Sequence, residues 1–145
     1  MRMQIKKEIL INADVKKVWK IFSKLERWSM WSDCITNAKW ISKTEWKTGS
    51  KFTQTVKGFG IFRAFKSNPV ILDVKLFKLI SWSGTRKLIK GVHTFKFQKI
   101  GNKTKVLNIE HFRGLLAPFI FPLIKNKFGL YFEQFLNGLK IEAEK

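Results

Sequence analysis

The chain has 145 residues, 45% of them hydrophobic, a length and composition that suit one folded domain with its own core. Lys and Arg outnumber Asp and Glu by 29 to 10, which gives a net charge of +19. Specific nucleic-acid binding is disfavoured, because the cations are scattered, are mostly Lys, and accompany no nucleic-acid-binding motif. We therefore expect a single domain, 1–145, with solvated lysines and at most weak attraction to anionic surfaces.

The cysteine count and the longest apolar run indicate where the protein works. Cys34 is the only cysteine, so no intrachain disulfide can form, as is typical of a reducing compartment. Residues 1–19 lack the apolar segment of a signal peptide. The most apolar run, 115–124, is interrupted by Pro118 and Pro122 and is far shorter than the roughly 20 residues of a spanning helix. We expect a cytoplasmic protein without a transmembrane segment.

The N-terminal part of the chain predicts a strand followed by two short helices. Residues 4–11 favour a strand, and Asn12 or Asp14 is a suitable N-cap for the helix that follows. That helix is indicated by apolar residues at helical spacing, namely Val15, Val18, Trp19 and Phe22. Residues 23–33 favour a second short helix or turn, with Leu25, Trp28 and Trp31 on one side.

Residues 35–113 predict strands joined by turns. The segments 35–42 and 51–56 flank a polar loop that contains Gly49, which is typical of a hairpin. After the break at Asn68-Pro69, alternation in 70–84 places Leu72, Val74 and Leu76 on one face. The segments 91–100 and 103–114 form a second hairpin through the turn Gly101-Asn102-Lys103.

The C-terminal segment predicts a long helix with one apolar face. Its members recur at helical spacing: Ile124, Phe128, Phe132 (or Tyr131), Phe135 and Leu139. Pro122 suits the first turn of this helix. Pro118 and Pro122 should delay its start, so that 115–121 forms an apolar flap beside a pocket, or else packs into the core. The elements together predict an α+β fold in which a curved antiparallel sheet encloses a pocket against this helix.

Six segments of the chain resemble the START-like (SRPBCC, Bet v1-like) superfamily, and in particular its polyketide cyclase/dehydrase branch. They are 9–31, 46–52, 72–84, 91–97, 104–116 and 132–145. The resemblance implies a helix-grip fold, in which a sheet of about seven strands wraps around the long C-terminal helix, with two short helices after the first strand. It also implies a cavity for a lipid, a sterol or an aromatic polyketide-like molecule.

Members of the superfamily differ in function, so the resemblance leaves three alternatives. We expect the chain to bind a hydrophobic or amphipathic small molecule, with no cofactor and no catalysis required. A cyclase or dehydratase that uses His93 and Glu110 is the first alternative. A module that binds partners through its basic exterior, similar to activators of Hsp90, is the second.

Polar side chains interrupt two otherwise apolar strand faces. Alternation places His93 with Phe95 and Phe97. In the next strand it places Asn108 and Glu110 on the face of Val106 and Phe112. The three polar groups pair with one another, bind the polar end of a ligand, or act as acid and base. The family pattern often has a histidine where this chain has Asn108, which weakens the acid-base alternative.

A metal site is not expected, because the adjacent residues Glu110 and His111 should point to opposite faces of their strand. For Trp19, Trp28 and Trp31 we expect core packing. The alternative is that Trp28, Met30 and Trp31 form a mobile wall over the pocket. The predicted ligand-binding set comprises Trp28, Trp31, Phe52, Val74, Trp82, His93, Phe95, Phe97, Glu110, Phe112, Phe119, Phe128 and Phe132.

Overall fold

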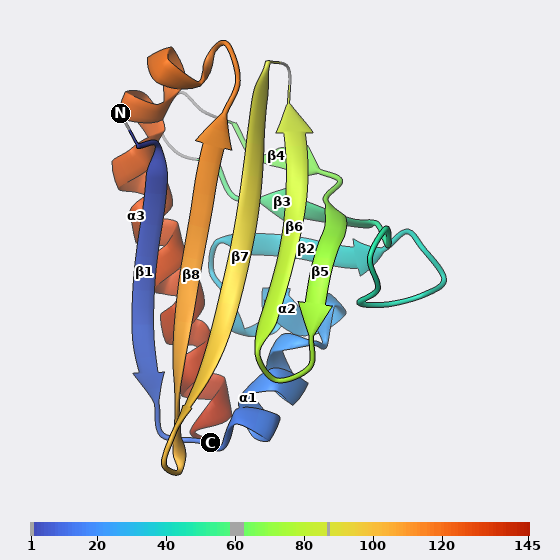
Figure 1. Ribbon diagram of the computed structural model, residues 1–145, viewed down its shortest axis with the longest axis vertical. Coiled ribbons are helices and arrows are strands. Elements are labelled where there is room, and N and C mark those ends of the chain that lie inside the picture. The colour runs from blue at the N-terminus through green and yellow to red at the C-terminus, as the bar shows by residue number, and fades with distance from the viewer. Residues whose placement is uncertain (1, 59–62, 87) are drawn as a thin grey trace.

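The structure is a computed structural model that describes every residue except 1, 59–62 and 87. The strands and helices within these residues follow one another as the sequence predicts (Figure 1). In chain order they are β1 (Gln4–Ile11), α1 (Val15–Phe22), a 3-10 turn (Leu25–Arg27), α2 (Trp28–Trp31), β2 (Ile35–Trp40), β3 (Phe52–Val56), β4 (Phe65–Ser67), β5 (Val70–Lys75), β6 (Leu79–Arg86), β7 (Ile89–Ile100), β8 (Lys103–Arg113) and α3 (Ala117–Ala143).

The strands of the described residues form two antiparallel sheets that meet at one point. The larger sheet has the order β1-β8-β7-β6-β5, and the smaller sheet has the order β2-β3-β4. An isolated bridge between Lys51 and Val70 joins them, and Ile71 N donates to Ser50 O at 2.8 Å. The expected antiparallel sheet beside a C-terminal helix is confirmed. It is divided in two because β3 and β5 pair only near their beginnings.

The first helix begins where its capping residue predicts. Asp14 is the N-cap, and its Oδ1 accepts a hydrogen bond from Lys16 N at 2.8 Å. This bond satisfies one of the free N–H groups of the first turn. Val15, Val18, Trp19 and Phe22 are all buried, so the helical spacing seen in the sequence corresponds to the face that packs on the sheet.

Phe22 is the centre of an aromatic core between α1, the sheet and α3. Its ring lies 4.8 Å from Phe95 and 5.2 Å from Phe97, measured between centroids. Trp28 is buried beside it and donates from Nε1 to Phe22 O at 2.7 Å. That hydrogen bond removes the cost of burying the indole N–H. The expected core packing of Trp28 is confirmed, and a mobile wall of Trp28, Met30 and Trp31 stays a prediction.

The predicted face of β5 is wrong because of a β-bulge. The pairing of β5 with β6 shifts register between Ile71 and Asp73, so Leu72 is left outside the regular alternation. Ile71 and Val74 therefore both pack on the core, whereas Leu72 is exposed. Leu76 lies beyond the end of the strand and is also exposed.

The predicted flap is also wrong, because α3 already begins at Ala117. Pro118 occupies the first turn, where its missing N–H is not needed. Pro122 lies inside the helix and cannot donate to the carbonyl of the residue four positions earlier. Packing outweighs this loss, since Ala117, Phe121 and Ile124 form a second apolar cluster with β1 and β8. None of the helices among the described residues has the length and apolarity needed to span a bilayer.

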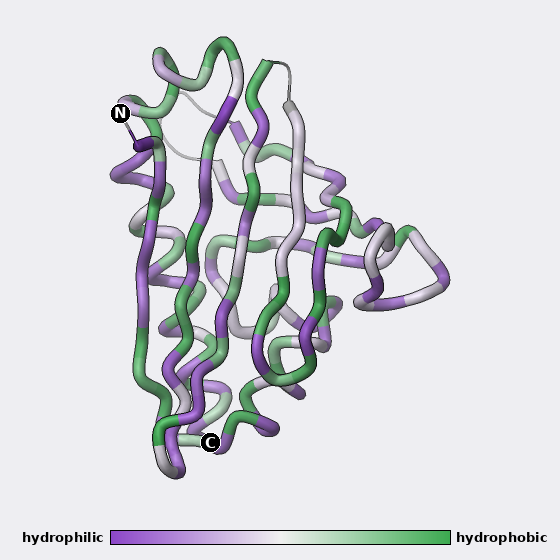
Figure 2. Tube along the Cα trace, viewed as in Figure 1, coloured by the Kyte–Doolittle hydropathy of each residue, from purple (hydrophilic) through white to green (hydrophobic). Residues whose placement is uncertain are grey.

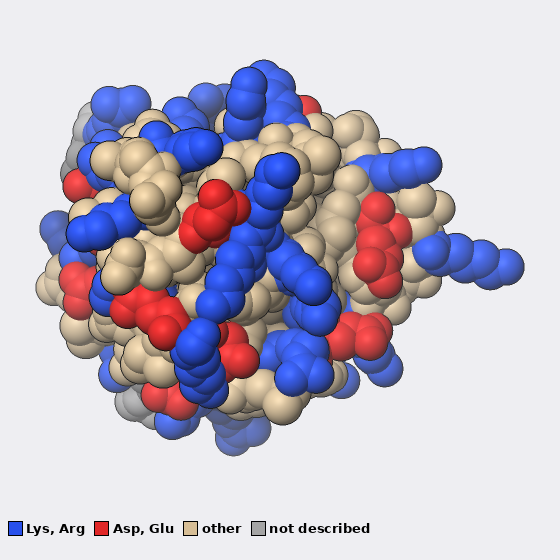
Figure 3. All heavy atoms as spheres, turned by 90° about the horizontal axis from the view of Figure 1, so that it is seen from below, with Lys and Arg blue, Asp and Glu red and all other residues tan. Residues whose placement is uncertain are grey.

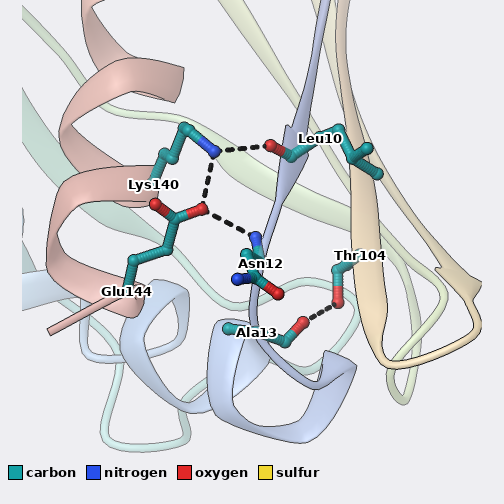
Figure 4. A network of polar contacts seen from close by, with 6 residues as sticks. All are labelled: Leu10, Asn12, Ala13, Thr104, Lys140 and Glu144. Carbon is teal, nitrogen blue, oxygen red and sulfur yellow. Dashed lines mark hydrogen bonds and ion pairs between the residues drawn. The ribbon is translucent and has the colours of Figure 1, made fainter.

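A polar network anchors the C-terminal end of α3 to the end of β1 (Figure 4). Glu144 Oε1 accepts from Asn12 N at 2.7 Å and from Lys140 Nζ at 2.6 Å. Lys140 Nζ also donates to Leu10 O at 2.9 Å. The same ammonium group therefore holds both a carboxylate and a strand carbonyl. These hydrogen bonds connect α3 with β1 at the lower end of the molecule, where the chain also ends (Figure 1).

Candidate functional site

The sheets and α3 enclose a cavity of about 510 Å³. Its inner part is lined by buried rings that include Trp28, Phe95 and Phe135. At its other end the lining residues Arg63 and Thr85 are exposed. The cavity therefore opens toward the upper end of Figure 1, where β4, the end of β6 and the first turns of α3 lie. Its volume is in the range of sites for small molecules.

Strand register brings three polar groups together on the cavity wall. His93 of β7 lies directly opposite Glu110 of β8, and Phe95 lies opposite Asn108. Figure 2 shows that hydrophilic positions interrupt the hydrophobic ones along both strands. Successive side chains of a strand point to opposite faces, so His93, Asn108 and Glu110 share the inner face with the aromatic rings. The predicted clustering of His93, Asn108 and Glu110 on the inner face is thus found.

The hydrogen bonds of His93 define which ring nitrogen carries the proton. His93 donates from Nε2 to Asn108 Oδ1, an oxygen that can only accept. In a neutral imidazole Nδ1 is then unprotonated, and it lies 3.7 Å from Glu110 Oε2. This separation exceeds a normal hydrogen-bond length. Glu110 therefore keeps hydrogen-bonding capacity that is directed into the cavity.

Burial keeps both His93 and Glu110 uncharged near neutral pH. It lowers the pKa of His93 from 6.5 to about 4, although the hydrogen bond to Asn108 acts in the opposite direction. It raises the pKa of Glu110 from 4.5 to about 8. The physical cause is the loss of hydration of an ionised group among apolar side chains. The pair therefore presents a neutral acid and a neutral imidazole.

Aromatic rings and one glycine hold this polar pair in place. The His93 ring stacks on Phe95 and on Phe132, each at 4.9 Å between centroids. A Cβ added at Gly91 would lie 2.5 Å from Glu110 Oε1, so only glycine leaves room for the carboxyl group. A side chain at position 91 would therefore require the Glu110 carboxyl group to move.

Cys34 and Tyr131 form another part of the cavity wall, between β2 and α3. The Tyr131 hydroxyl lies 2.8 Å from Lys57 O and 3.1 Å from Gly58 O, two carbonyls at the end of β3. Cys34 Sγ lies 3.2 Å from Ser32 Oγ, and burial raises the pKa of the thiol. The thiol therefore stays protonated near neutral pH, which disfavours a role as a nucleophile.

Most of the predicted ligand-binding set lines the cavity, namely Trp28, Trp82, His93, Phe95, Glu110, Phe112, Phe128 and Phe132. The others do not line it. Trp31 packs on Phe135 and Phe97 packs on Trp19. Phe52 is buried against Trp82, and Val74 packs on the core. Phe119 points to solvent. Contact with a ligand remains a prediction for every one of these residues.

Sequence reasoning missed lining residues from several regions. They come from the start of β2, from 54–69, from β6 and β7, and from α3 and its N-cap, and they include Ile35, Val56, Phe65, Leu116, Ile120 and Ile124. The last three recur at intervals of four, which is a helical signal that the expected late start of α3 concealed. Among the described residues, no three His, Cys, Asp or Glu side chains lie close enough together to hold a metal ion.

Comparison with known proteins identifies related sequences and structures. The family model described as polyketide cyclase / dehydrase and lipid transport matches residues 2–144. Comparison with curated proteins gives no match. A hypothetical protein from Helicobacter pylori is 17% identical with a TM-score of 0.81, over 97% of this chain and 87% of that chain.

Two further solved structures have the same arrangement of elements. A START superfamily protein from Mycobacterium smegmatis is 16% identical with a TM-score of 0.80, over 97% of each chain. The di-domain ARO/CYC protein StfQ from the steffimycin biosynthetic pathway is 10% identical with a TM-score of 0.74. That likeness covers 98% of this chain and 50% of StfQ. At such identities the likeness shows the fold and not the ligand.

Proposed function

Because the chain belongs to the polyketide cyclase/dehydrase and lipid transport family and has its START-like helix-grip fold, we propose that it binds a hydrophobic or amphipathic small molecule in the cavity. The observation that carries this proposal is an apolar cavity of about 510 Å³ with one neutral polar pair in its wall. The rings bury the body of the ligand, and burial of apolar area supplies the driving force.

The charge state of the wall favours a ligand whose buried part is uncharged. Among the described lining residues, Arg63 is the only one with a permanent charge, and it lies exposed at the open end. Protonated Glu110 donates a hydrogen bond and also accepts one. A carbonyl or hydroxyl group therefore suits the position beside Glu110 and His93, as in a sterol, a protonated fatty acid or an aromatic polyketide.

A cavity-filling variant tests the proposal. A Cβ at Gly84 meets no atom within 4 Å, so Gly84→Leu places a side chain in the cavity without a backbone clash. Ser83→Leu is the control, because Ser83 is next to it on β6 but is absent from the cavity lining. We expect a fatty acid, a sterol or a polycyclic aromatic ketone to raise the Tm of the native chain and of the control, but not of Gly84→Leu.

Two results would contradict small-molecule binding. One is that none of the three probe classes raises the Tm of the native chain, while native mass spectrometry of the purified protein detects no bound molecule. The other is an equal rise in Tm for the native chain and for Gly84→Leu, which would place the binding outside the cavity.

The single free thiol, Cys34, supports a cytoplasmic location, which we propose as well.

A cyclase or dehydratase is the second candidate, because an acid and a base face the same cavity. In favour of it, Glu110 is protonated near neutral pH and His93 Nδ1 is free to accept a proton. Against it, a base with a pKa of about 4 has little affinity for a proton at pH 7. If an aromatic polyketide is converted by the native chain, His93→Gln and Glu110→Gln should each reduce kcat at least about tenfold. Full turnover by both variants would exclude this role.

A further inference from the structure

The outward side of α3 changes character halfway along the helix. Its second half presents polar side chains such as Glu133 and Gln134 to solvent. Its first half and the residues just before it present Leu115, Phe119 and Leu123, whose exposed fractions are 74%, 73% and 67%. We call these three residues the mouth face, because they lie at the end where the cavity opens (Figure 1).

The mouth face is an exposed apolar set at the start of α3. Phe119 and Leu123 are four residues apart and so lie on one side of the helix, and Leu115 lies in the turn just before the N-cap. Pro118 and Pro122, which lie between them in the sequence, are exposed as well. The inner side of the same turns is apolar as well, because Leu116, Ile120 and Ile124 line the cavity. A helix that is apolar on both sides is expected to be covered on both.

Cations flank the mouth face along the chain, and acids are sparse in the part of the sequence around it. Exposed Arg113 ends β8 just before it, Lys90 pairs with Arg113 across the sheet, and exposed Lys125 follows it. From residue 46 to residue 132 the sequence has two acids, Asp73 and Glu110. Glu110 lines the cavity, and Asp73 lies on β5, at the opposite edge of the large sheet from β1.

The opposite end of the molecule has a different charge pattern. Figure 3 shows that end from below, with acidic groups interspersed among the lysines. Ion pairs join Glu142 to Lys145 and Glu144 to Lys140 at the C-terminal end of α3, and Glu8 of β1 to Lys105 of β8. Of these two ends, the mouth face is the one where ion pairs with acids compensate less of the positive charge.

We propose that the mouth face docks on an anionic phospholipid bilayer. Leu115, Phe119 and Leu123 enter the boundary between headgroups and acyl chains, while Arg113 and Lys125 contact the anionic headgroups. Apolar insertion and attraction to anionic lipid are the two contributions that hold an amphipathic surface on a bilayer. Docking in this orientation turns the open end of the cavity toward the lipid.

The charge pattern favours a bilayer over other partners. A second copy of the chain, packed face to face, would bring two sets of cations together around the apolar residues. Nucleic acid would match the cations but would leave the apolar side chains exposed to water. An anionic bilayer is complementary both to the cations and to the apolar side chains. This docking does not depend on what the cavity binds.

Vesicle co-sedimentation tests the proposal. The probes are vesicles of phosphatidylcholine alone and of phosphatidylcholine with about a third phosphatidylglycerol. We expect binding to the anionic vesicles, and at least a tenfold loss on replacing the mouth face by Leu115→Ser, Phe119→Ser and Leu123→Ser together. Ile141→Ser is the matched control, because Ile141 is 65% exposed on the polar half of the same helix. Phe119→Ser alone should lose binding to an intermediate degree. This single variant keeps the test valid if the triple variant does not fold.

Variants of exposed lysines and a variant of the cavity complete the experiment. Lys125→Glu should weaken binding several-fold more than Lys20→Glu, which changes an exposed lysine of α1. Gly84→Leu should bind vesicles as the native chain does, which separates docking from ligand binding. The proposal is overturned if anionic vesicles do not bind, if the triple variant and Ile141→Ser bind equally, or if the triple variant only converts a dimer into a monomer.

Discussion

Replacing Glu110 by Gln should remove a specific pH dependence of stability. Burial raises the pKa of Glu110 in the native state to about 8, whereas the unfolded chain keeps a value near 4.5. The native state thus holds a proton that the unfolded chain releases between these values. Glu110 contributes stability that is fully present below pH 4.5 and is lost as the pH rises toward 8.

The contribution of His93 to the stability changes with pH in the opposite direction, and it does so over a lower range of pH. Its pKa is lowered from 6.5 to about 4, so its contribution is present above pH 6.5 and is lost as the pH falls toward 4. The two contributions oppose each other between 4.5 and 6.5, and Glu110 acts alone between 6.5 and 8. That window of one and a half pH units, at about 1.4 kcal/mol per unit, corresponds to about 2 kcal/mol.

The assay is urea unfolding at 25 °C, followed by tryptophan fluorescence, at several pH values from 6 to 8.5. We expect the native chain to lose about 2 kcal/mol of unfolding free energy between pH 6.5 and 8.5 relative to Glu110→Gln. The two proteins should be most alike in stability below pH 4.5, where Glu110 is protonated in both the native and the unfolded state. Glu45→Gln, at an exposed position, is the control and should follow the native chain.

Two outcomes would refute this reasoning. Parallel curves for the native chain and Glu110→Gln would mean that Glu110 is already ionised in the native state. A variant that is less stable than the native chain at pH 8 would indicate an ion pair with His93. NMR titration provides an independent measurement, because the His93 ring should remain neutral until the pH approaches 4.

Three further substitutions test the packing of α3. Gly138→Ala should cost about 1–3 kcal/mol of stability, because its Cβ would lie 2.0 Å from the backbone oxygen of Trp31. Gly129→Ala in the same helix should instead be neutral or stabilising, since its Cβ meets only the flexible end of Lys7; equal losses in thermal unfolding would contradict this packing. Tyr131→Phe should cost about 1 kcal/mol and speed hydrogen exchange at the end of β3; unchanged exchange there would contradict the bond.

The site was partly accessible from the sequence because strand alternation is a local property. Alternation alone placed His93 and Glu110 on the inner faces of β7 and β8, and the hairpin turn at Gly101 set their register. Leu72 shows the limit of the same rule, because one bulge reverses which side chains reach the core. No local pattern marks such a bulge.

The start of α3 was mispredicted because its stability comes from distant parts of the chain. Local propensity favours a break at Pro122, which lacks an N–H to donate. Burial of Phe121 and Ile124 against Ile5 and Phe112 stabilises the helical turns in spite of that break. For this reason the cavity residues Leu116 and Ile120, and the mouth face, were not recognised as belonging to the N-cap and first turns of one helix or to the turn before it.

The sequence by itself determined the order of the elements, the family resemblance, the positive charge and the inner faces of the two longest strands. Each of these follows from residue type and spacing along a short stretch of chain. Only the tertiary structure decided where the cavity opens, and only it decided that Glu110 and His93 are both neutral. A pKa depends on how far the surrounding chain excludes water from a group, and that chain comes from segments distant in sequence.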